Sequence, residues 1–184
     1  MIEKGKNYAQ EYAEKVLKNK KLHCKTEIQA VERYLRLKEK KGIWLDVDAA
    51  NWAMDFIETF CRYKEGEVAG QNIRLNDWQK FNLTCIFGFL KKNRFNNDVR
   101  VIRTSYIQIP RKNDKTTMGG GVGNYMLFGD GELGAECFCA ATERAQADIA
   151  ASKIISSIEN SPDLKSRATI YKNTNKVVYS YTVD

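Results

Sequence analysis

The feature that most constrains the fold is the stretch Arg100-Val-Ile-Arg-Thr-Ser-Tyr-Ile-Gln-Ile-Pro-Arg-Lys-Asn-Asp-Lys-Thr-Thr117, an apolar-rich run that leads into a basic, polar turn. This order predicts a β-strand, then a phosphate-binding loop, then a helix whose unpaired amides and dipole favour an anion. The pattern GxxxxGK[ST] places a lysine at the outer phosphates and a hydroxyl at a metal ion. Lys115 and Thr116 match these two positions.

The loop departs from that pattern at two positions, because Ile109 replaces the first glycine and Asp114 replaces the glycine before the lysine. Asp114 matters more, since it adds a Cβ atom and a negative charge beside a polyanion. Aspartate enters the left-handed region more readily than most residues, so the turn can still form. We therefore expect weakened nucleotide binding. The competing interpretation is an exposed basic turn without a ligand.

Composition excludes a membrane-spanning or disordered chain. Hydrophobic residues make up 43% of the 184 residues, and no apolar run approaches the roughly 20 residues that span a bilayer. The net charge of +7 is mild support for a polyanionic partner such as nucleic acid. An odd number of cysteines, five, and an N-terminus without an apolar signal region predict reduced thiols and a cytoplasmic location.

Two cysteines and the single histidine are further candidate site residues. Cys137 and Cys139 lie two residues apart, which on a strand places both on one face. No second cysteine pair or suitably placed histidine completes a metal site, so we expect them to be buried small residues. His23 lies in a lysine-rich connector, and we expect a solvated surface residue there.

Helical spacing of apolar residues predicts four helices before the loop. The third carries an aromatic stripe of Trp52, Phe56 and Phe60, expected to be core rather than a base-stacking platform. The helices are predicted at about 7–19, from a Thr26–Gln29 capping box to the Lys38–Lys41 region, from an Asp46 or Asp48 cap to Phe60, and from an Asn76 or Asp77 cap to Lys91–Lys92.

The second half of the chain predicts a βαβ unit. Thr116–Phe128 is expected to be helical although its four glycines cost roughly 3 to 4 kcal/mol of intrinsic helix stability. Close packing of this helix on a sheet would explain the glycines. A buried strand at Ala135–Ala141, a helix from an N-cap at Thr142 to about Asn160 and a C-terminal hairpin at 167–183 follow. The predicted fold class is therefore α/β, with a P-loop NTPase-type parallel sheet covered by helices and preceded by an N-terminal helical region. The predicted domains are 1–70 and 71–184.

Three pieces of the chain together resemble the N-terminal ATPase part of the large terminase subunit of tailed bacteriophages. They are Leu75-Asn-Asp-Trp-Gln-Lys-Phe81 with Ile86–Leu90 downstream, Ile109–Thr117, and Gly131–Glu136 running into Ala140–Ala147. The resemblance covers most of residues 40–184. It implies an ATP-driven motor that packages double-stranded DNA into procapsids.

The resemblance also implies a site and partners. Gln79 matches an adenine-recognising glutamine, Arg111 an arginine that acts on the γ-phosphate, Lys115 the phosphate lysine and Thr116 the metal hydroxyl. The expected nucleotide-binding set is Gln79, Arg111, Lys112, Asn113, Asp114, Lys115, Thr116 and Thr117, with Arg111 as the catalytic candidate. Expected cofactors are ATP and Mg²⁺. Expected partners are double-stranded DNA, the portal protein, the small terminase subunit and further copies in a ring, in the cytoplasm of the bacterial host.

Two features of the family are not visible in the sequence: the acidic Walker B pair and the metal-binding carboxylates of the nuclease. A strand at Val177–Asp184 that ends in a Walker B aspartate is a weak candidate for the first. ATP hydrolysis by this chain alone is therefore uncertain. The alternatives are a helicase-like P-loop ATPase and a non-catalytic DNA- or protein-binding module with a degenerate loop.

Overall fold

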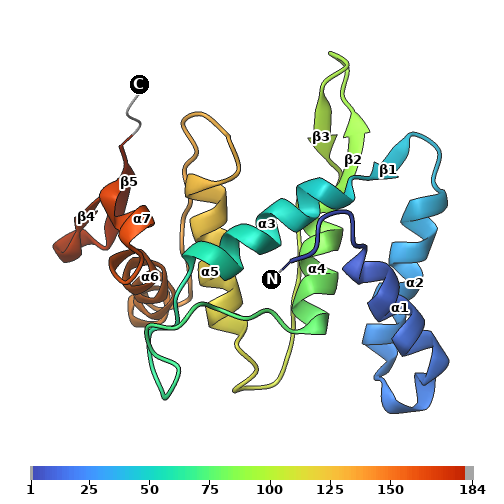
Figure 1. The fold of residues 1–184 in the computed structure, drawn as a ribbon, viewed down its shortest axis with the longest axis horizontal. Helices are drawn as coiled ribbons and strands as arrows, with labels where there is room; N and C mark the ends of the chain where they lie inside the picture. Colours follow the sequence, from blue (N-terminus) through green and yellow to red (C-terminus); the bar gives the residue numbers. More distant parts are fainter. Residues whose placement is uncertain (1, 181–184) are drawn as a thin grey trace. The chain divides into compact units, whose positions relative to one another are not determined.

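The computed structural model describes residues 2–180 (Figure 1). Helices dominate this part of the chain, and the strands are short. In chain order the elements are α1 (Tyr8–Lys18), the 3-10 helix η1 (Lys20–Leu22), α2 (Lys25–Glu39), β1 (Ile43–Leu45), α3 (Val47–Phe60), α4 (Asp77–Gly88), β2 (Phe89–Lys92), β3 (Asp98–Arg100), α5 (Lys115–Phe128), α6 (Arg144–Glu159), α7 (Pro162–Ser166), β4 (Ala168–Tyr171), the 3-10 helix η2 (Lys172–Thr174) and β5 (Lys176–Tyr179). Among residues 2–180, no helix combines the length and apolar character that crossing a bilayer requires.

The chain forms two compact units, each built from two separate segments. Unit 1 comprises residues 1–54 and 75–107, and unit 2 comprises residues 55–74 and 108–184. Helix α3 begins in the first unit and ends in the second. The domain division between residues 70 and 71 stays a prediction, because compactness alone does not define a part that folds by itself.

Unit 1 is organised around aromatic side chains from α1, α2, α4 and β2. The ring centroids of Tyr12 and Phe81 lie 5.1 Å apart, and Tyr34 makes edge-on contacts at 5.8 Å with both Phe81 and Phe89. These four side chains are at least nine-tenths buried. Large aromatic rings bury much apolar surface each, so a small unit gains a substantial core from few residues. The predicted helices of this region are confirmed.

Several predicted boundaries in unit 1 are wrong. The capping box at Thr26 is not formed, because α2 begins at Lys25 with Cys24 as its N-cap residue. Trp52 is 52% exposed instead of lying in the core, whereas Phe56, on the part of α3 that belongs to unit 2, is 4% exposed, as expected. Helix α4 ends at Gly88, before the predicted end, because the chain turns there into β2. Only glycine fits at this bend, since a Cβ atom would lie 2.9 Å from the backbone oxygen of Asp46.

The strands form two small antiparallel sheets, one of β1, β2 and β3 and one of β4 and β5. The expected parallel sheet is therefore absent from the described residues. The stretch predicted as one strand before the loop is divided between the units: Arg100 pairs with Leu90 and the amide of Val101 donates to Phe89, whereas residues 102–110 lie outside helices and strands. Residues 135–141 also form no strand. An apolar pattern favours extended backbone, but a strand also needs a neighbour that completes its hydrogen bonds.

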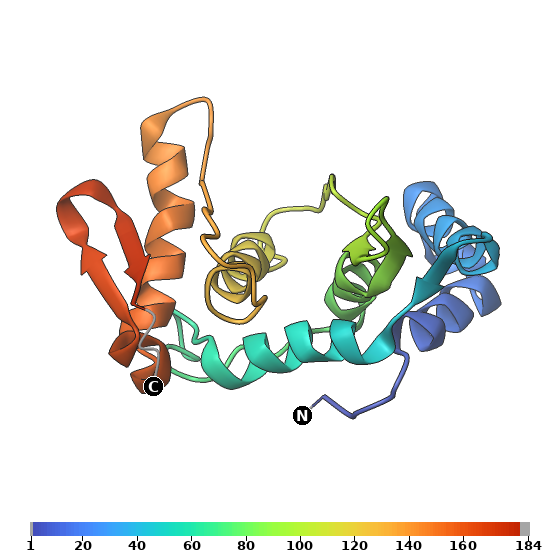
Figure 2. The ribbon, with the colours of Figure 1, turned by 90° about the horizontal axis from the view of Figure 1, so that it is seen from above.

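Unit 2 is built on the packing of α5 against α6 and the end of α3. The predicted helix 116–128 is confirmed, and so is the hairpin, formed by β4 and β5 beside α6 (Figures 1 and 2). The glycines face other helices instead of a sheet. A Cβ atom on Gly121 would lie 3.0 Å from Cγ2 of Ile57, and one on Gly123 would lie 3.0 Å from Cδ1 of Ile154. Helix α6 begins at Arg144, so Thr142 is not its N-cap.

Candidate phosphate-binding loop

Residues 110–114 form an exposed turn immediately before α5. The side-chain amide of Asn113 donates to the carbonyl oxygens of Arg111 at 3.2 Å and Pro110 at 3.4 Å, which folds the turn back on its own backbone. Lys112 has φ 66°, and Asp114 has φ 54° and ψ 23°. The turn thus places Asp114 in a left-handed conformation, which glycine adopts without strain and which aspartate tolerates better than most residues.

Helix α5 begins at Lys115, directly after this turn. Its first hydrogen bond joins the amide of Met118 to the carbonyl oxygen of Asp114 at 2.9 Å. The three preceding amides, from Lys115 to Thr117, have no partner within the helix, as at any helix start. The Asp114 side chain does not cap these amides. An exposed ammonium, two half-buried hydroxyls and free helix amides are therefore available to an anion and its metal ion.

Of the two elements expected on either side of the loop, a strand before it and a helix after it, only the helix is present. The helix is present and anchored, with Met118, Gly120, Gly121, Asn124 and Tyr125 buried. The segment before the loop is not a strand, and Arg111, Lys112 and Asn113 are exposed. The predicted helix is therefore present directly after the loop, and the roles of the individual loop residues stay predictions.

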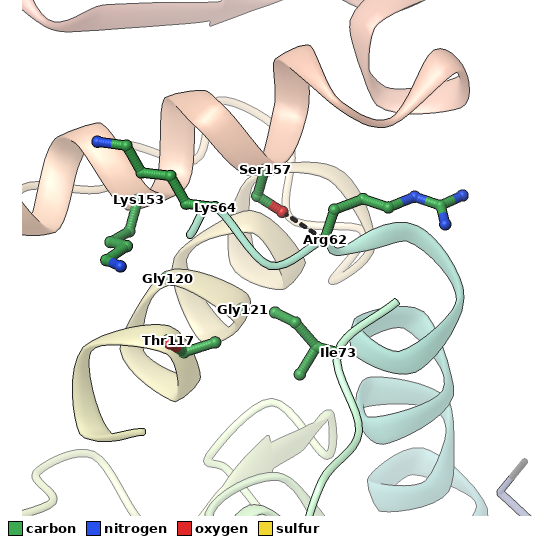
Figure 3. Close-up of a pocket in the computed structure, with 8 residues that line it drawn as sticks. All are labelled: Arg62, Lys64, Ile73, Thr117, Gly120, Gly121, Lys153 and Ser157. Carbon is green, nitrogen blue, oxygen red and sulfur yellow. Dashed lines mark hydrogen bonds between the residues drawn. The ribbon is translucent and has the colours of Figure 1, made fainter. Parts of the chain in front are cut away.

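A small cavity of about 10 Å³ lies beside α5 (Figure 3). Thr117 is the one predicted site residue among those that line this cavity. Gly120 and Gly121 of the same helix line it as well. Lys64 and Lys153 lie on one side of it, while the guanidinium group of Arg62 points the opposite way (Figure 3). The volume suits one water-sized sphere, not a nucleotide.

Sequence reasoning missed the cationic side chains near this cavity, because they come from separate segments. Lys153 lies on α6, and its ammonium is 3.4 Å from Glu65. Lys64 contacts Glu65 at 3.8 Å and Ser152 at 3.2 Å. Nothing in the local sequence around Lys64 or Lys153 distinguishes them from other surface lysines. Lys153 comes near Thr117 through the packing of α6 on α5, and Lys64 comes from the segment that follows α3.

Gln79, the predicted base-reading residue, lies in unit 1, near the start of α4. It is 2% exposed, so it is not a surface glutamine. Its side-chain oxygen, Oε1, accepts a hydrogen bond from the backbone amide of Asn76 at 2.9 Å. The backbone amide of Gln79 in turn donates to Oδ1 of Asn76 at 3.2 Å. This reciprocal pair is a capping box, visible in the sequence as Asn followed three residues later by Gln. A structural role for Gln79 therefore stands beside the predicted one.

The cysteine pair has a different environment from the one expected. Cys137 and Cys139 are exposed, because residues 135–141 form no buried strand. They line a groove of about 640 Å³ in unit 2, with residues of α5, α6 and the β4–β5 hairpin. Within residues 2–180, no cluster of three or more His, Cys, Asp or Glu side chains could hold a metal ion. His23 is only partly exposed, and its Nδ1 lies 3.0 Å from Glu27.

Comparisons with known proteins place these observations in a family. The family described as "Terminase large subunit, ATPase domain" matches residues 77–181, which is more than half of the chain. No curated protein matches the chain. A crystal structure of the HK97 bacteriophage large terminase shares the fold, with 23% sequence identity and a TM-score of 0.52. The similarity covers 71% of this chain and 25% of that one, so the chain spans about a quarter of the HK97 protein's length. On the family match, the chain belongs to the ATPase domain family of terminase large subunits.

Proposed function

We propose that this chain binds Mg-ATP at Arg111–Thr117 and forms part of a motor that packages double-stranded DNA. The observation that carries the proposal is the left-handed turn at Asp114 directly before the exposed start of α5. This geometry leaves the first helix amides, Lys115 and Thr116 available to a phosphate group, although glycine is absent from the loop. Hydrolysis and DNA translocation are proposed for the whole terminase, of which this chain resembles one part.

The residues divide into roles by their chemistry. The Lys115 ammonium would contact the outer phosphates, the Thr116 hydroxyl would hold Mg²⁺, and the Arg111 guanidinium suits a bidentate contact with the γ-phosphate. Lys112, Asn113 and Thr117 would contribute backbone and side-chain donors around the turn. Mg²⁺ would neutralise developing charge on the phosphates. A Walker B role for Asp184 concerns a residue outside those that the structure describes.

Equilibrium titration of the full chain with a fluorescent ATP analogue and Mg²⁺ tests the site. Lys115→Ala should weaken binding at least tenfold, which is roughly 1.4 kcal/mol. The charge-matched control is Lys165→Ala, which removes an exposed lysine elsewhere in unit 2. Equal affinity of the two variants, or no measurable binding by the unaltered chain, would support the degenerate binding module instead.

Asp114 provides a second test, in the opposite direction. If its carboxylate repels phosphate, Asp114→Gly should tighten nucleotide binding by about tenfold, because glycine adopts the same left-handed conformation without the charge. Asp114→Asn separates the two factors, since asparagine also tolerates this conformation and is neutral. Tightening in the glycine variant alone would assign the defect to the Cβ atom, and tightening in both would assign it to the charge.

The base-reading role of Gln79 is tested by a substitution that preserves the helix cap. Gln79→Glu retains a side-chain oxygen for the Asn76 amide, because glutamate also forms capping boxes, but it loses the amide donor. If Gln79 reads adenine, the variant should lose its preference for ATP over GTP while its thermal stability is retained. An unchanged preference would leave Gln79 with the capping role alone.

The partners follow from the family and are proposals for the whole protein. They are double-stranded DNA, the portal protein, the small terminase subunit and further copies in a ring. A helicase-like ATPase remains the alternative within the P-loop class. Stimulation of ATP turnover by blunt duplex DNA in the complete protein favours the packaging motor, whereas turnover that requires single strands and separates them favours the helicase.

A further inference from the structure

The net positive charge of the chain is confined to unit 1. This unit contains 18 Lys and Arg against 10 Asp and Glu, a net charge of +8. Unit 2, which carries the candidate phosphate loop, contains 12 against 13, a net charge of −1. The basic character of the chain therefore does not come from the nucleotide site, and a second polyanion-binding surface has to be sought in unit 1.

The β2–β3 hairpin of unit 1 has a tip that is closed by hydrogen bonds within the turn. Its turn, Asn93–Asn97, is closed by a hydrogen bond from the amide of Asn93 to the oxygen of Asn97 at 2.9 Å. Oδ1 of Asn93 accepts from the amides of Phe95 at 2.8 Å and Asn97 at 3.0 Å. Because these amides are satisfied within the turn, the side chains of Arg94 and Phe95 are held outward. Phe95 is 67% exposed, with the Arg94 guanidinium 4.5 Å from its ring centroid.

Further cations flank this tip. Lys91 pairs in register with Ile43 of β1, and β1 is entered through a turn closed by a hydrogen bond from the amide of Ile43 to the oxygen of Lys40. The sheet register therefore brings Lys40 and Lys41 to the same end of the sheet as Lys91. All of these lysines are exposed, as is Arg94. We name Lys40, Lys41, Lys91 and Arg94 the hairpin cations.

No carboxylate among the described residues neutralises the hairpin cations, whereas several other lysines of unit 1 are paired with one. Lys15 lies 2.7 Å from Asp77, Lys6 lies 3.0 Å from Glu3, and Lys92 lies 2.7 Å from Asp98. Within residues 2–180, none of the four hairpin cations forms an ion pair. Unpaired, exposed lysine and arginine side chains on a rigid frame are suited to phosphate oxygens, which form most contacts to duplex DNA.

We propose that the β2–β3 hairpin and the Lys40–Ile43 turn form a surface that binds the sugar–phosphate backbone of double-stranded DNA. The inference rests on the proposed function for the identity of the polyanion, and it adds the location of the contact. Binding here needs no nucleotide, because the hairpin cations and the loop at Arg111–Thr117 belong to different units. The contacts are to backbone phosphates, so sequence preference is not expected.

The test is fluorescence anisotropy of a labelled 30-base-pair duplex with the full chain, without nucleotide, over a series of KCl concentrations. The triple variant Lys41→Ala, Lys91→Ala, Arg94→Ala is compared with Lys18→Ala, Lys21→Ala, Lys25→Ala. The control removes the same charge from exposed lysines of the same unit. The slope of log K against log salt is negative, and its magnitude falls by about 0.9 for each phosphate contact that is lost. The slope of the hairpin variant should therefore be shallower by roughly 2 to 3. We expect its affinity at 100 mM KCl to fall at least tenfold and that of the control less than threefold.

Equal losses in the two triple variants would overturn the proposal, because binding would then follow net charge alone. A hairpin variant with unchanged affinity would overturn it as well. Acetylation footprinting is independent of mutant folding: duplex DNA should protect Lys41 and Lys91 of the unaltered chain but not Lys18 and Lys21. The reverse protection pattern would place the DNA elsewhere. The DNA-binding result does not depend on whether the chain binds ATP. Lys115→Ala should retain its affinity for DNA, and the hairpin variant should retain its affinity for ATP.

Discussion

The two compact units obtain their cores in different ways. Unit 1 fills its interior with large rings, from Tyr12, Tyr34, Phe81 and Phe89, and carries all of the net positive charge. Unit 2 brings helix backbones close together through the glycines of α5 and buries a polar side chain, Asn124, among them. The comparison teaches that the candidate nucleotide site lies on a nearly neutral unit whose helices pack closely through glycines. The positive charge that attracts a polyanion lies on the other unit, whose core is filled by large aromatic side chains.

This difference can be followed with separate probes. The three tryptophans, Trp44, Trp52 and Trp78, all belong to unit 1, so tryptophan fluorescence reports its unfolding. Unit 2 contains Cys61, whose buried thiol reacts only after that unit opens. The other four cysteines also react, and Cys85 belongs to unit 1, so modification of Cys61 has to be followed by mass spectrometry of its peptide. Urea titrations followed by tryptophan fluorescence and by Cys61 modification then measure the two units within the same intact chain.

The largest effect is expected from Phe81→Ala in unit 1. The Phe81 ring is 4% exposed and touches both Tyr12 and Tyr34, so its removal leaves a cavity that costs about 3 to 5 kcal/mol. The fluorescence transition should shift to lower urea, and the thiol transition of Cys61 should shift less. Phe95→Ala is the control, because that ring is exposed and should cost little. Equal shifts of both probes would contradict separate units and indicate one cooperative body.

The next effect concerns two glycines of the same helix. Gly121→Leu should destabilise unit 2 by about 1 to 3 kcal/mol, because a Cβ atom there would already lie 3.0 Å from Cγ2 of Ile57 and a larger side chain would overlap it. Gly119→Ala should instead stabilise unit 2 by up to about 1 kcal/mol, since nothing lies within 4 Å of that Cβ position and alanine is the better helix former. Thiol reactivity in urea measures both. The same sign for the two substitutions would refute backbone proximity as the basis of this packing.

A third prediction uses the pH dependence of unit 2. Burial raises the pKa of the Cys61 thiol from 9.0 to about 11, and contacts with Ser157 and Asn124 offset only part of the rise. The unfolded thiol then ionises above about pH 9 while the folded thiol stays protonated, so this group destabilises the fold as the pH rises from 9 towards 11. Up to about 1.4 kcal/mol should be lost per pH unit in that window.

The measurement is urea unfolding followed by circular dichroism at pH 8 and pH 10. The stability of the unaltered chain should fall more between these pH values than that of Cys61→Ala, which lacks the titrating thiol. Cys24→Ala is the control: that thiol is exposed, and its pKa is lowered chiefly by the Thr26 side chain. An identical pH response of the unaltered chain and Cys61→Ala would show that the Cys61 environment does not disfavour the thiolate.

The extent to which sequence predicted the two units differs for a physical reason. The helices of unit 1 follow from local signals, namely apolar spacing and caps such as Asp46, whose Oδ1 accepts from the amide of Ala49 at 2.9 Å. In unit 2, helix α5 was predicted, and the left-handed turn at Asp114 also depends on local preferences, which the sequence allowed. The parallel sheet was not a local property: residues 102–110 and 135–141 have a strand-like pattern, but strand formation depends on partners that the pattern does not specify.

The candidate site follows the same division. Lys115 and Thr116 could be proposed from the motif because the loop and the helix start are contiguous in sequence. Lys64 and Lys153 were missed because they come near Thr117 only through tertiary packing, Lys153 from α6 and Lys64 from the segment after α3. The buried state of Gln79 was also missed, although the spacing of Asn76 and Gln79 was a sufficient signal for a capping box.

The smallest expected change in stability concerns the capping box of Asn76 and Gln79. It tests how much a purely local interaction contributes to unit 1, beside the contribution of its aromatic core. Asn76→Ala should destabilise unit 1 by about 1 kcal/mol, because the amide of Gln79 loses its acceptor and the helix start loses its cap. Gln79→Glu should change stability by less than about 0.5 kcal/mol, since its carboxylate still accepts from the Asn76 amide and sits favourably at the positive end of the helix dipole. Tryptophan fluorescence in urea measures both, with Asn82→Ala, in the interior of the same helix, as a control for loss of an amide side chain. A larger loss for Gln79→Glu than for Asn76→Ala would mean that burying a carboxylate at this 2%-exposed position costs more than the cap contributes.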